Sequence, residues 1–198
     1  QVMYKVTNFK WVPKPSATET VFDALQPAIR FTKDECLDLP DMVYVTREVP
    51  LTRQQEKYYK ELKSRMVMEA AEETVTAATA AVNMSKLLQI SGGAVYTDDN
   101  EVVEFDIKHR YKVLREVIDE SSKKVLIFVP FKHTIALLTE KLRADGIPTE
   151  VISGAVKATE RTRIFKEFQE TNTPQVLVIQ PQAAAHGVTL TAANTIVW

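Results

Sequence analysis

The stretch that decides the fold is KVLIFVPFKHTIALLTEKL, residues 124–142. It opens with a continuous apolar run of strand length, KVLIFV, and continues into a segment whose apolar residues recur at helical spacing. A strict alternation of apolar and polar residues would indicate a sheet with one wet face, whereas a continuous run indicates a strand buried on both faces. The stretch therefore predicts a strand of a parallel sheet, followed by a helix over roughly 132–144.

The same pattern continues toward the end of the chain. TEVIS at 149–153 and QVLVIQ at 175–180 have the composition of two further strands, and TIVW at 195–198 begins a fourth. A helix is predicted over 159–170, with Ile164, Phe165 and Phe168 on its inner face. Strands that alternate with amphipathic helices predict the α/β class, a parallel sheet with helices on both faces. We expect TIVW to lie beside VLVI or its neighbour, with the loop 180–191 at the carboxyl edge of the strands.

The first part of the chain has a different character. Residues 1–40 contain four prolines and are predicted to be irregular, apart from a helix that Ser16 or Thr18 would cap. MVYVTREVPL at 42–51 alternates apolar and polar residues and predicts a strand. Together these features predict little regular structure before residue 42.

Helices are predicted between residues 52 and 122. Thr52 and Gln55 fit a capping box, and the absence of Gly and Pro after them predicts one long helix to about residue 82, with Tyr58, Leu62 and Met66 on its apolar face. Asn83 would cap a second, short helix that the pair Gly92–Gly93 ends. Asp106 would cap a third helix, which carries Tyr111, Leu114 and Ile118 on one face.

Composition restricts the function classes. The chain has 198 residues, a net charge of −1 and 45% hydrophobic residues, which is ordinary for a globular protein. No apolar run is long enough to span a membrane, and the single cysteine, Cys36, excludes an intramolecular disulfide and favours a reducing compartment. Residues 123–198 carry nine Lys and Arg against six Asp and Glu, while residues 1–122 carry sixteen against twenty. This distribution permits an anion-binding face on the C-terminal half.

Several kinds of catalytic site are missing from the sequence. The five glycines cannot assemble a phosphate-binding loop of the G-x-x-x-x-G-K-[ST] or G-x-G-x-x-G type. The three histidines have no metal-ligand spacing, and the acidic run DDNE at 98–101 is typical of a solvated turn. Cys36 has no activating neighbour in the sequence. We therefore expect no catalysis by this chain alone, and no metal or cofactor bound to it.

Three segments at the predicted strand ends resemble motifs of a known family. KVLIFVPFKHTIALLTEKL resembles motif IV of superfamily 2 helicases, and ISGAVKATERTRIFKEFQ at 152–169 resembles the segment that follows it, with Gly154, Arg161 and Phe168 at matching places. VLVIQPQAAAHGVTLTAANTIVW at 176–198 resembles motif V. Together they resemble the second RecA-like lobe of the Swi/Snf family of DNA-dependent ATPases and helicases, with a pattern more similar to phage or bacterial members than to eukaryotic remodellers.

The likeness extends upstream and has departures. LPDMVYVTREVPLTRQQEKYYKEL at 39–62 resembles the start of this lobe, and KLLQISGG at 86–93 resembles a helix that the family usually continues with His-Pro. Motif V of the family often has a Lys or Arg and paired glycines where this chain has Gln182, Ala185 and His186, and Asn where it has Thr189. These departures concern individual contacts in the lobe rather than the lobe itself.

The resemblance implies a domain organisation. Residues 1–40 would be the tail of the first lobe, 41–122 a strand and helical subregion of the second lobe, and 123–198 its RecA-like core. The family's catalytic arginine, in motif VI, would follow Trp198, and the first lobe would precede residue 1, so the sequence is interpreted as part of a longer protein. The parent would hydrolyse ATP with Mg²⁺ between its two lobes.

The resemblance also assigns candidate residues. Contacts to nucleic-acid phosphates are expected from the loops after the three strands, at Lys132, His133, Ser153, Gly154, Lys157, Arg161, Gln180, Gln182 and Thr191. Gly187 and Thr189 would face the ATP cleft. For most of these positions an ordinary structural role stays open: a surface helix start at Lys132 and His133, a tight turn at Gly154, and an ion pair with a nearby acid for Arg161.

The expected partners are duplex DNA, rather than RNA, and the first RecA-like lobe, with no membrane. The expected compartment is the cytoplasm of a bacterial or phage-infected cell, or the nucleus of a eukaryote. An alternative from another class stays open at this point. The long Ala-rich helix and the acidic N-terminal half could form a non-catalytic module for docking another protein.

Overall fold

The computed structural model describes residues 2–29, 42–71, 77–97, 99, 101–184 and 188–198. The chain divides into two units, Gln1–Thr46 and Arg47–Trp198, which are described separately here. No helix in the described ranges is long and apolar enough to cross a membrane.

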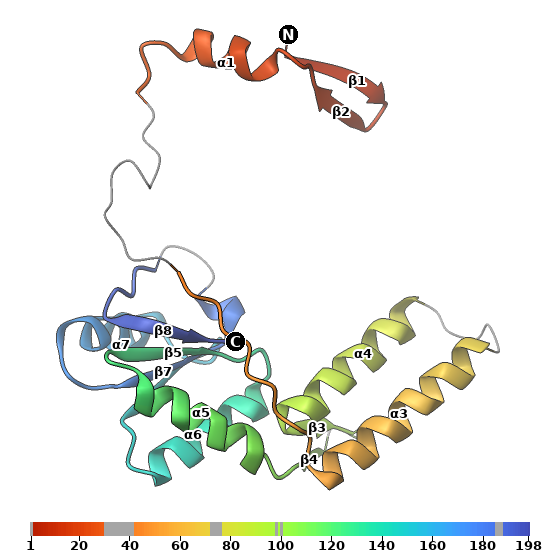
Figure 1. The fold of residues 1–198 in the computed structure, drawn as a ribbon, viewed down its shortest axis with the longest axis vertical. Helices are drawn as coiled ribbons and strands as arrows, with labels where there is room; N and C mark the ends of the chain where they lie inside the picture. Colours follow the sequence, from red (N-terminus) through yellow and green to blue (C-terminus); the bar gives the residue numbers. More distant parts are fainter. Residues whose placement is uncertain (1, 30–41, 72–76, 98, 100, 185–187) are drawn as a thin grey trace. The chain divides into compact units, whose positions relative to one another are not determined.

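The second unit is built on a four-stranded parallel sheet (Figure 1). Its strands are β5 (Lys124–Phe128), β6 (Thr149–Ile152), β7 (Val176–Ile179) and β8 (Ala193–Val197), in the spatial order β6-β7-β5-β8. Val125 of β5 lies opposite Val176 of β7 on one side and Thr195 of β8 on the other. The α/β fold with a parallel sheet is confirmed, and the last strand lies beside β5, the neighbour of VLVI, as the sequence predicts.

Helices cover both faces of the sheet because successive side chains of each strand point to opposite faces. Val125 and Ile127 pack with helices α5 (Lys108–Glu120) and α6 (Lys132–Ala144). Leu126, between them, packs on the other face with helix α7 (Ala158–Glu170), through Ile164 and Phe168. Both β5 and β7 are therefore buried on two sides, which is why their sequences read as continuous apolar runs.

The helix ends in this unit follow local signals in the sequence. Asp106 accepts a hydrogen bond from the backbone N–H of Lys108 at 2.9 Å, and this bond lowers the pKa of the Asp106 carboxyl. Beyond α6, Gly146 takes a left-handed conformation with φ +74°. The N-cap position of α5 is Ile107, without a side-chain capping bond, so the prediction that Asp106 caps this helix is wrong by one residue, whereas Leu114 and Ile118 are buried on its inner face as expected. The predicted end of the helix over 132–144 is confirmed.

A helical hairpin precedes the sheet. Helix α3 (Arg53–Ala71) packs against α4 (Ala77–Gly92), so the prediction of one helix from 53 to about 82 is wrong (Figure 1). Asn83 lies inside α4 and is buried, so it caps no helix, because α4 already begins at Ala77. The predicted end at Gly92–Gly93 is confirmed, and Gly93 has φ +110°.

The capping box at the start of α3 is confirmed. Thr52 N–H donates to Gln55 Oε1 at 3.1 Å, and Gln55 N–H donates to Thr52 Oγ1 at 3.5 Å. Both residues are buried, and Gln55 Nε2 also donates to the Ile90 carbonyl of α4 at 2.9 Å. Gln55 therefore takes part in the cap of α3 and also hydrogen-bonds this helix to the end of α4.

A small antiparallel pair follows the hairpin, β3 (Ala94–Tyr96) with β4 (Val102–Glu104). It carries a separate core cluster of Ile90, Val95 and Phe105, against which Tyr59 and Leu62 of α3 pack. In the sequence, the acidic run DDNE at 98–101 is flanked by these two strands. Neither β3 nor β4 was predicted from the sequence, because a strand of three residues is too short to show a pattern.

The first unit consists of a hairpin and a helix. Strand β1 (Met3–Thr7) pairs antiparallel with β2 (Lys10–Pro13), and helix α1 (Ala17–Leu25) follows. The prediction that residues 1–40 are irregular missed this hairpin, whose strands are short and largely exposed. Ser16 is at the N-cap position of α1 as expected, although its side chain makes no capping bond. No residue in the described part of this unit is buried.

The strand predicted over 42–51 is not formed. These residues have no regular structure, and the side chains of Val43, Tyr44 and Val45 are 69–85% exposed. Alternation indicates a strand only where a neighbouring strand supplies hydrogen bonds, and none pairs with this segment within the described residues. Residues 47–52 instead connect to the start of α3.

Candidate nucleic-acid interface at the strand ends

Three loops meet at the carboxyl edge of the parallel sheet. They follow β5, β6 and β7, and they begin at Val129, Ser153 and Gln180 respectively. Strands that run in the same direction place their carboxyl ends at one edge, which is where ligands bind in open α/β sheets. Most of the candidate residues assigned from the sequence therefore lie on this one edge of the fold.

Gln180 ties two of these loops together. Its backbone N–H donates to the Ile152 carbonyl at 2.8 Å, which extends the ladder between β6 and β7. Its side-chain Oε1 accepts a bond from the Gly154 N–H at 3.2 Å. The candidate residue Gln180 thus holds the candidate loop at Gly154, and its amide oxygen is occupied by the protein itself.

Arg161 joins the same two loops from the first turns of α7. Its Nη1 donates to the Ala183 carbonyl at 2.9 Å, and its Nη2 donates to the carbonyls of Ser153 at 3.3 Å and Val156 at 3.2 Å. Its Nε is buried without a hydrogen-bond partner in the described chain. Every acceptor of these bonds is a backbone carbonyl. Within the described residues, Arg161 therefore does not form the ion pair with a nearby acid that was left open as its alternative role.

Gly154 has no conformational reason to be glycine. Its φ lies outside the left-handed region, and a Cβ atom built on it would meet only Gln180 Oε1, at 4.0 Å. Gly154 nevertheless lies in a tight turn, because the Val156 N–H donates to the Ser153 carbonyl at 3.1 Å, so the turn interpretation is supported without a steric need for glycine. The residue is exposed, so the bare backbone faces outward at the edge where the three loops meet.

The two candidates after β5 differ in their surroundings. Lys132 is exposed at the first position of α6 and makes no ion pair within the described residues. His133 is half-buried, and its ring packs edge-on against Tyr96 of β3 with 4.6 Å between ring centres. Lys157, at the N-cap of α7, is exposed like Lys132, so two unpaired ammonium groups flank the edge.

The loop after β7 begins with a short 3₁₀ turn, η1 (Pro181–Ala183), which carries the exposed Gln182. Thr189 is also exposed. Thr191 accepts a hydrogen bond from Gln169 Nε2 at 3.1 Å, so its hydroxyl is joined to α7. Gly187, with its neighbours Ala185 and His186, lies outside the described residues.

The sequence reasoning missed two residues that position the opposite, amino edge of the sheet, where β5 and β8 begin and where Thr191 therefore also lies. Gln169 holds the end of the loop, because its Oε1 also accepts the Ala192 N–H at 2.9 Å. Lys124 donates from its Nζ to the carbonyls of Phe168 and Thr171, both at 2.6 Å, and burial lowers the pKa of this ammonium. The position of Gln169 four residues after Phe165 is the one sequence signal that places it on the sheet side of α7.

Other charges on α7 are already neutralised. Arg163 forms ion pairs with Glu160 and Glu167, one helical turn away on either side. The hydrogen bonds that Arg163 donates to Glu160 and then to Glu167 raise the pKa of its guanidinium. The positive charge available at the sheet edge therefore comes from Lys132 and Lys157 rather than from this arginine.

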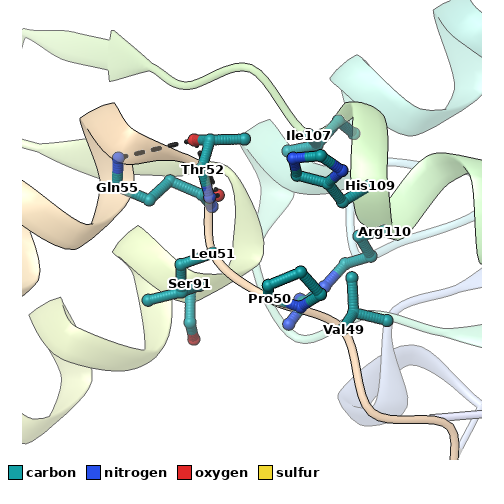
Figure 2. Close-up of a pocket in the computed structure, with 9 residues that line it drawn as sticks. All are labelled: Val49, Pro50, Leu51, Thr52, Gln55, Ser91, Ile107, His109 and Arg110. Carbon is teal, nitrogen blue, oxygen red and sulfur yellow. Dashed lines mark hydrogen bonds between the residues drawn. The ribbon is translucent and has the colours of Figure 1, made fainter.

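A small pocket lies away from this edge, where the chain enters α3 (Figure 2). It is lined by Val49, Pro50, Leu51, Thr52, Gln55, Ser91, Ile107, His109 and Arg110. Its volume is about 220 Å³ including space open to solvent. Among the described residues no group of three or more His, Cys, Asp or Glu side chains could hold a metal.

Comparison with known protein families gives a match over the part of the chain that contains the parallel sheet. Residues 109–198, from α5 to the end of the sheet, match the helicase conserved C-terminal domain. The matched segment makes up a little less than half of the chain. It contains all four parallel strands and every candidate residue of the sheet edge.

Individual relatives support the same assignment. The chain is 25% identical over 174 residues to an uncharacterized ATP-dependent helicase, MG018, of Mycoplasma genitalium, covering 85% of this chain and 17% of that protein. It is 30% identical over 112 residues to the ATP-dependent RNA helicase DBP2 of Scheffersomyces stipitis, covering 56% of this chain and 21% of the relative. The chain thus spans about a fifth of the length of these curated relatives.

A solved structure agrees on the fold. The C-terminal domain of the Sulfolobus solfataricus SWI2/SNF2 ATPase superposes with a TM-score of 0.59 at 19% identity, over 75% of this chain and 67% of that domain. The similarity extends beyond residues 109–198, since it covers three quarters of the chain. The sheet and helices described above are those of a RecA-like lobe.

Proposed function

We propose that this chain is the second RecA-like lobe of an ATP-dependent, nucleic-acid-stimulated helicase or translocase of the Swi/Snf type. Its carboxyl sheet edge binds nucleic-acid phosphates and forms part of the ATP cleft. The observation that carries the proposal is the junction of the loops after β6 and β7 by Gln180 and Arg161, inside a segment that matches the helicase C-terminal domain. A junction of this kind fixes the relative position of two loops that contact one ligand.

We propose different roles for the candidate residues. Lys132 and Lys157 supply unpaired positive charge, and the exposed backbone of Gly154 allows a phosphate to approach. His133, Ser153 and Gln182 lie on the same edge and could donate hydrogen bonds. Arg161, Gln180 and Thr191 act as positioning residues, because their polar groups already bond to the protein.

The ATP-facing part of the proposal concerns Gly187 and Thr189. Thr189 is exposed, in the segment that leads from the loop after β7 into β8, and we propose that it faces a nucleotide held by another lobe. The described residues contain no group of three or more His, Cys, Asp or Glu side chains that could hold a metal, and we propose that Mg²⁺ is held by the rest of the parent protein. The chain alone is expected not to hydrolyse ATP.

We further propose duplex DNA as the nucleic acid, on the Swi/Snf resemblance of the motifs. The RNA helicase among the relatives makes duplex RNA the direct competitor.

We also propose residues 1–40 as the tail of the preceding lobe, 41–122 as a helical subregion and 123–198 as the core. The absence of buried residues in the described part of the first unit supports the first of these, because such a segment needs another surface to pack on. The expected compartment is the cytoplasm of a bacterium or infected cell, or a nucleus.

The test is nucleic-acid binding by the whole 198-residue chain. Fluorescence anisotropy with a labelled duplex DNA, titrated from about 50 to 200 mM salt, gives the dependence of affinity on salt. The double variant Lys132→Gln/Lys157→Gln should reduce the slope of log affinity against log salt by about 2, since each lost phosphate contact removes about 1. Gly154→Ala should weaken binding with an unchanged melting temperature.

The matched control is Lys112→Gln/Lys166→Gln, which removes the same charge from exposed helix positions. Equal slopes for the two double variants would contradict the proposed edge. A duplex RNA of the same sequence is titrated in parallel, and tighter binding of RNA would reverse the choice of nucleic acid. ATP turnover by the pure chain would contradict its assignment as a lobe that is inactive alone.

The alternative is a protein-docking module on the helical hairpin. Its supporting observation is the exposed apolar stripe on α4, where Met84 and Leu88 are 54% and 56% exposed. In that case the chain would bind no duplex at low salt.

A further inference from the structure

The outer face of α3 carries a row of positive charge outside the helicase C-terminal domain. Arg53, Lys57 and Lys60 are exposed and recur at spacings of four and three residues, so they lie on one side of the helix. The opposite side holds Gln55, Tyr59 and Leu62, which face the hairpin and its core cluster. We call Arg53, Lys57 and Lys60 the α3 basic stripe.

The stripe is only partly neutralised. Glu56 bonds to Lys60 at 3.3 Å, an exposed pair of the kind that contributes little. Arg53 and Lys57 form no ion pair with any described residue. Helix α7 shows the contrasting arrangement, because its Arg163 is held between two glutamates.

Local energetics disfavour this arrangement. Like charges three and four residues apart repel each other on a helix surface, by about 0.2–0.5 kcal/mol per pair. Arg53 and Lys57 also lie near the helix N-terminus, where the backbone dipole disfavours cations. Neither cost is offset by packing, since these side chains are exposed. Local rules of this kind are broken most often at functional sites, where a bound anion relieves the repulsion.

The net positive charge of α3 also differs from the net negative charge of the rest of residues 1–122. Helix α3 carries five Lys and Arg against three Asp and Glu, whereas the rest of residues 1–122 carries eleven against seventeen. A basic row in an acidic region presents a local positive potential rather than continuing a general one. Any polyanion that approaches this half of the chain is therefore attracted to α3.

We propose that the α3 basic stripe is a second contact for the sugar–phosphate backbone of a nucleic acid, separate from the carboxyl sheet edge. The rise of 1.5 Å per residue spreads Arg53 to Lys60 over about 10 Å, which matches about three phosphate steps of one duplex strand. Such a contact positions the nucleic acid without reading its bases. The inference rests on the proposed function in that both contacts serve the same ligand.

The experiment compares triple variants of the whole chain. Arg53→Gln/Lys57→Gln/Lys60→Gln keeps residues of similar helix propensity at exposed positions, so the fold is expected to persist, as circular dichroism would verify. In anisotropy titrations of duplex DNA against salt, the slope of log affinity against log salt should fall by about 3. The matched control Lys112→Gln/Lys123→Gln/Lys166→Gln should leave the slope unchanged.

The outcomes separate this inference from the proposed function. A normal slope in the stripe variant, with a reduced slope in Lys132→Gln/Lys157→Gln, would overturn the stripe and leave the sheet edge standing. A reduced slope in the stripe variant, with a normal slope in Lys132→Gln/Lys157→Gln, would support the stripe and overturn the contact at the sheet edge. Absence of any duplex binding by the unaltered chain would overturn both.

A protein partner is tested separately. Labelled poly-glutamate stands for an acidic protein surface, and duplex RNA tests whether the contact depends on the sugar. Tighter binding of poly-glutamate than of duplex, lost in the stripe variant, would assign the stripe to an acidic protein and refute the proposal. Stripe-dependent binding of either duplex supports it, and their relative affinities identify the source of the phosphates.

Discussion

At the scale of single residues, Arg161 shows how a charged side chain can act on the backbone alone. Its two terminal nitrogens serve three carbonyls in two loops, an arrangement that the planar fork of a guanidinium suits and a single ammonium does not. Its contribution to binding is therefore indirect, through the positions of Ser153, Gly154 and Ala183. The charge itself stays beside the loops and adds to their positive potential.

We expect Arg161→Ala to lower the free energy of unfolding by about 1–3 kcal/mol, because partly buried carbonyls lose their donors. Arg161→Lys should recover only part of the loss. Urea denaturation monitored by circular dichroism measures both changes. Arg163→Ala, on the same helix, is the control and should change stability little, because its ion pairs are exposed. A larger loss for Arg163→Ala than for Arg161→Ala would contradict this assignment.

At the scale of elements, helix boundaries depend on a few side chains. The hairpin of α3 and α4 begins with a capping box that is also buried, so Thr52 and Gln55 satisfy backbone groups that water cannot reach. Glycines follow the C-terminal ends of helices α4 and α6. Gly93 ends α4 and Gly146 follows α6, both with positive φ.

Thr52→Ala should destabilise the chain by about 1 kcal/mol, the usual cost of removing a helix cap. Thr52→Ser keeps the hydroxyl and should retain most of the stability. Thermal melting of the three proteins by circular dichroism distinguishes these cases. Equal melting temperatures for Thr52→Ala and Thr52→Ser would show that the hydroxyl contributes nothing at this helix start.

The two helix-ending glycines should differ in their tolerance of alanine. Gly146→Ala should cost about 1–2 kcal/mol from its left-handed backbone alone, because a Cβ there meets nothing within 4 Å. Gly93→Ala adds a clash, with Cβ only 2.3 Å from Ile107 Cγ2, and should cost a further 1–3 kcal/mol. Chemical denaturation curves give both values. The assignment of the clash would be wrong if Gly146→Ala were the more damaging change.

At the scale of the whole molecule, the sequence predicts the RecA-like half far better than the first half. Continuous apolar strands and amphipathic helices arise from burial on two faces, so β5, α6 and β7 follow directly from the pattern. The hairpin of α3 and α4 was missed because residues 53–82 contain no Gly or Pro to mark a turn. The alternation at Val43 and Val45 predicted a strand, but no described strand pairs with this segment.

The candidate site was predictable to the level of loops but not of bonds. Its location follows from strand direction, which the sequence indicates. The roles of Gln180 and Arg161 depend on contacts between loops that are more than 20 residues apart along the chain, and no local pattern reveals these. Gln169 was missed for the same reason, because its partners Thr191 and Ala192 belong to another segment.

The strand order β6-β7-β5-β8 has a consequence for synthesis and folding. The first strand of the sheet to leave the ribosome, β5, occupies an inner position and must wait for partners whose residues, Val176 and Ala193, are made much later. Such distant pairings are slow to form, because a long loop must close before any ladder bond is gained. Until then Val125, Leu126 and Ile127 expose two unpaired edges. A nascent chain stalled before residue 176 should therefore be prone to aggregate.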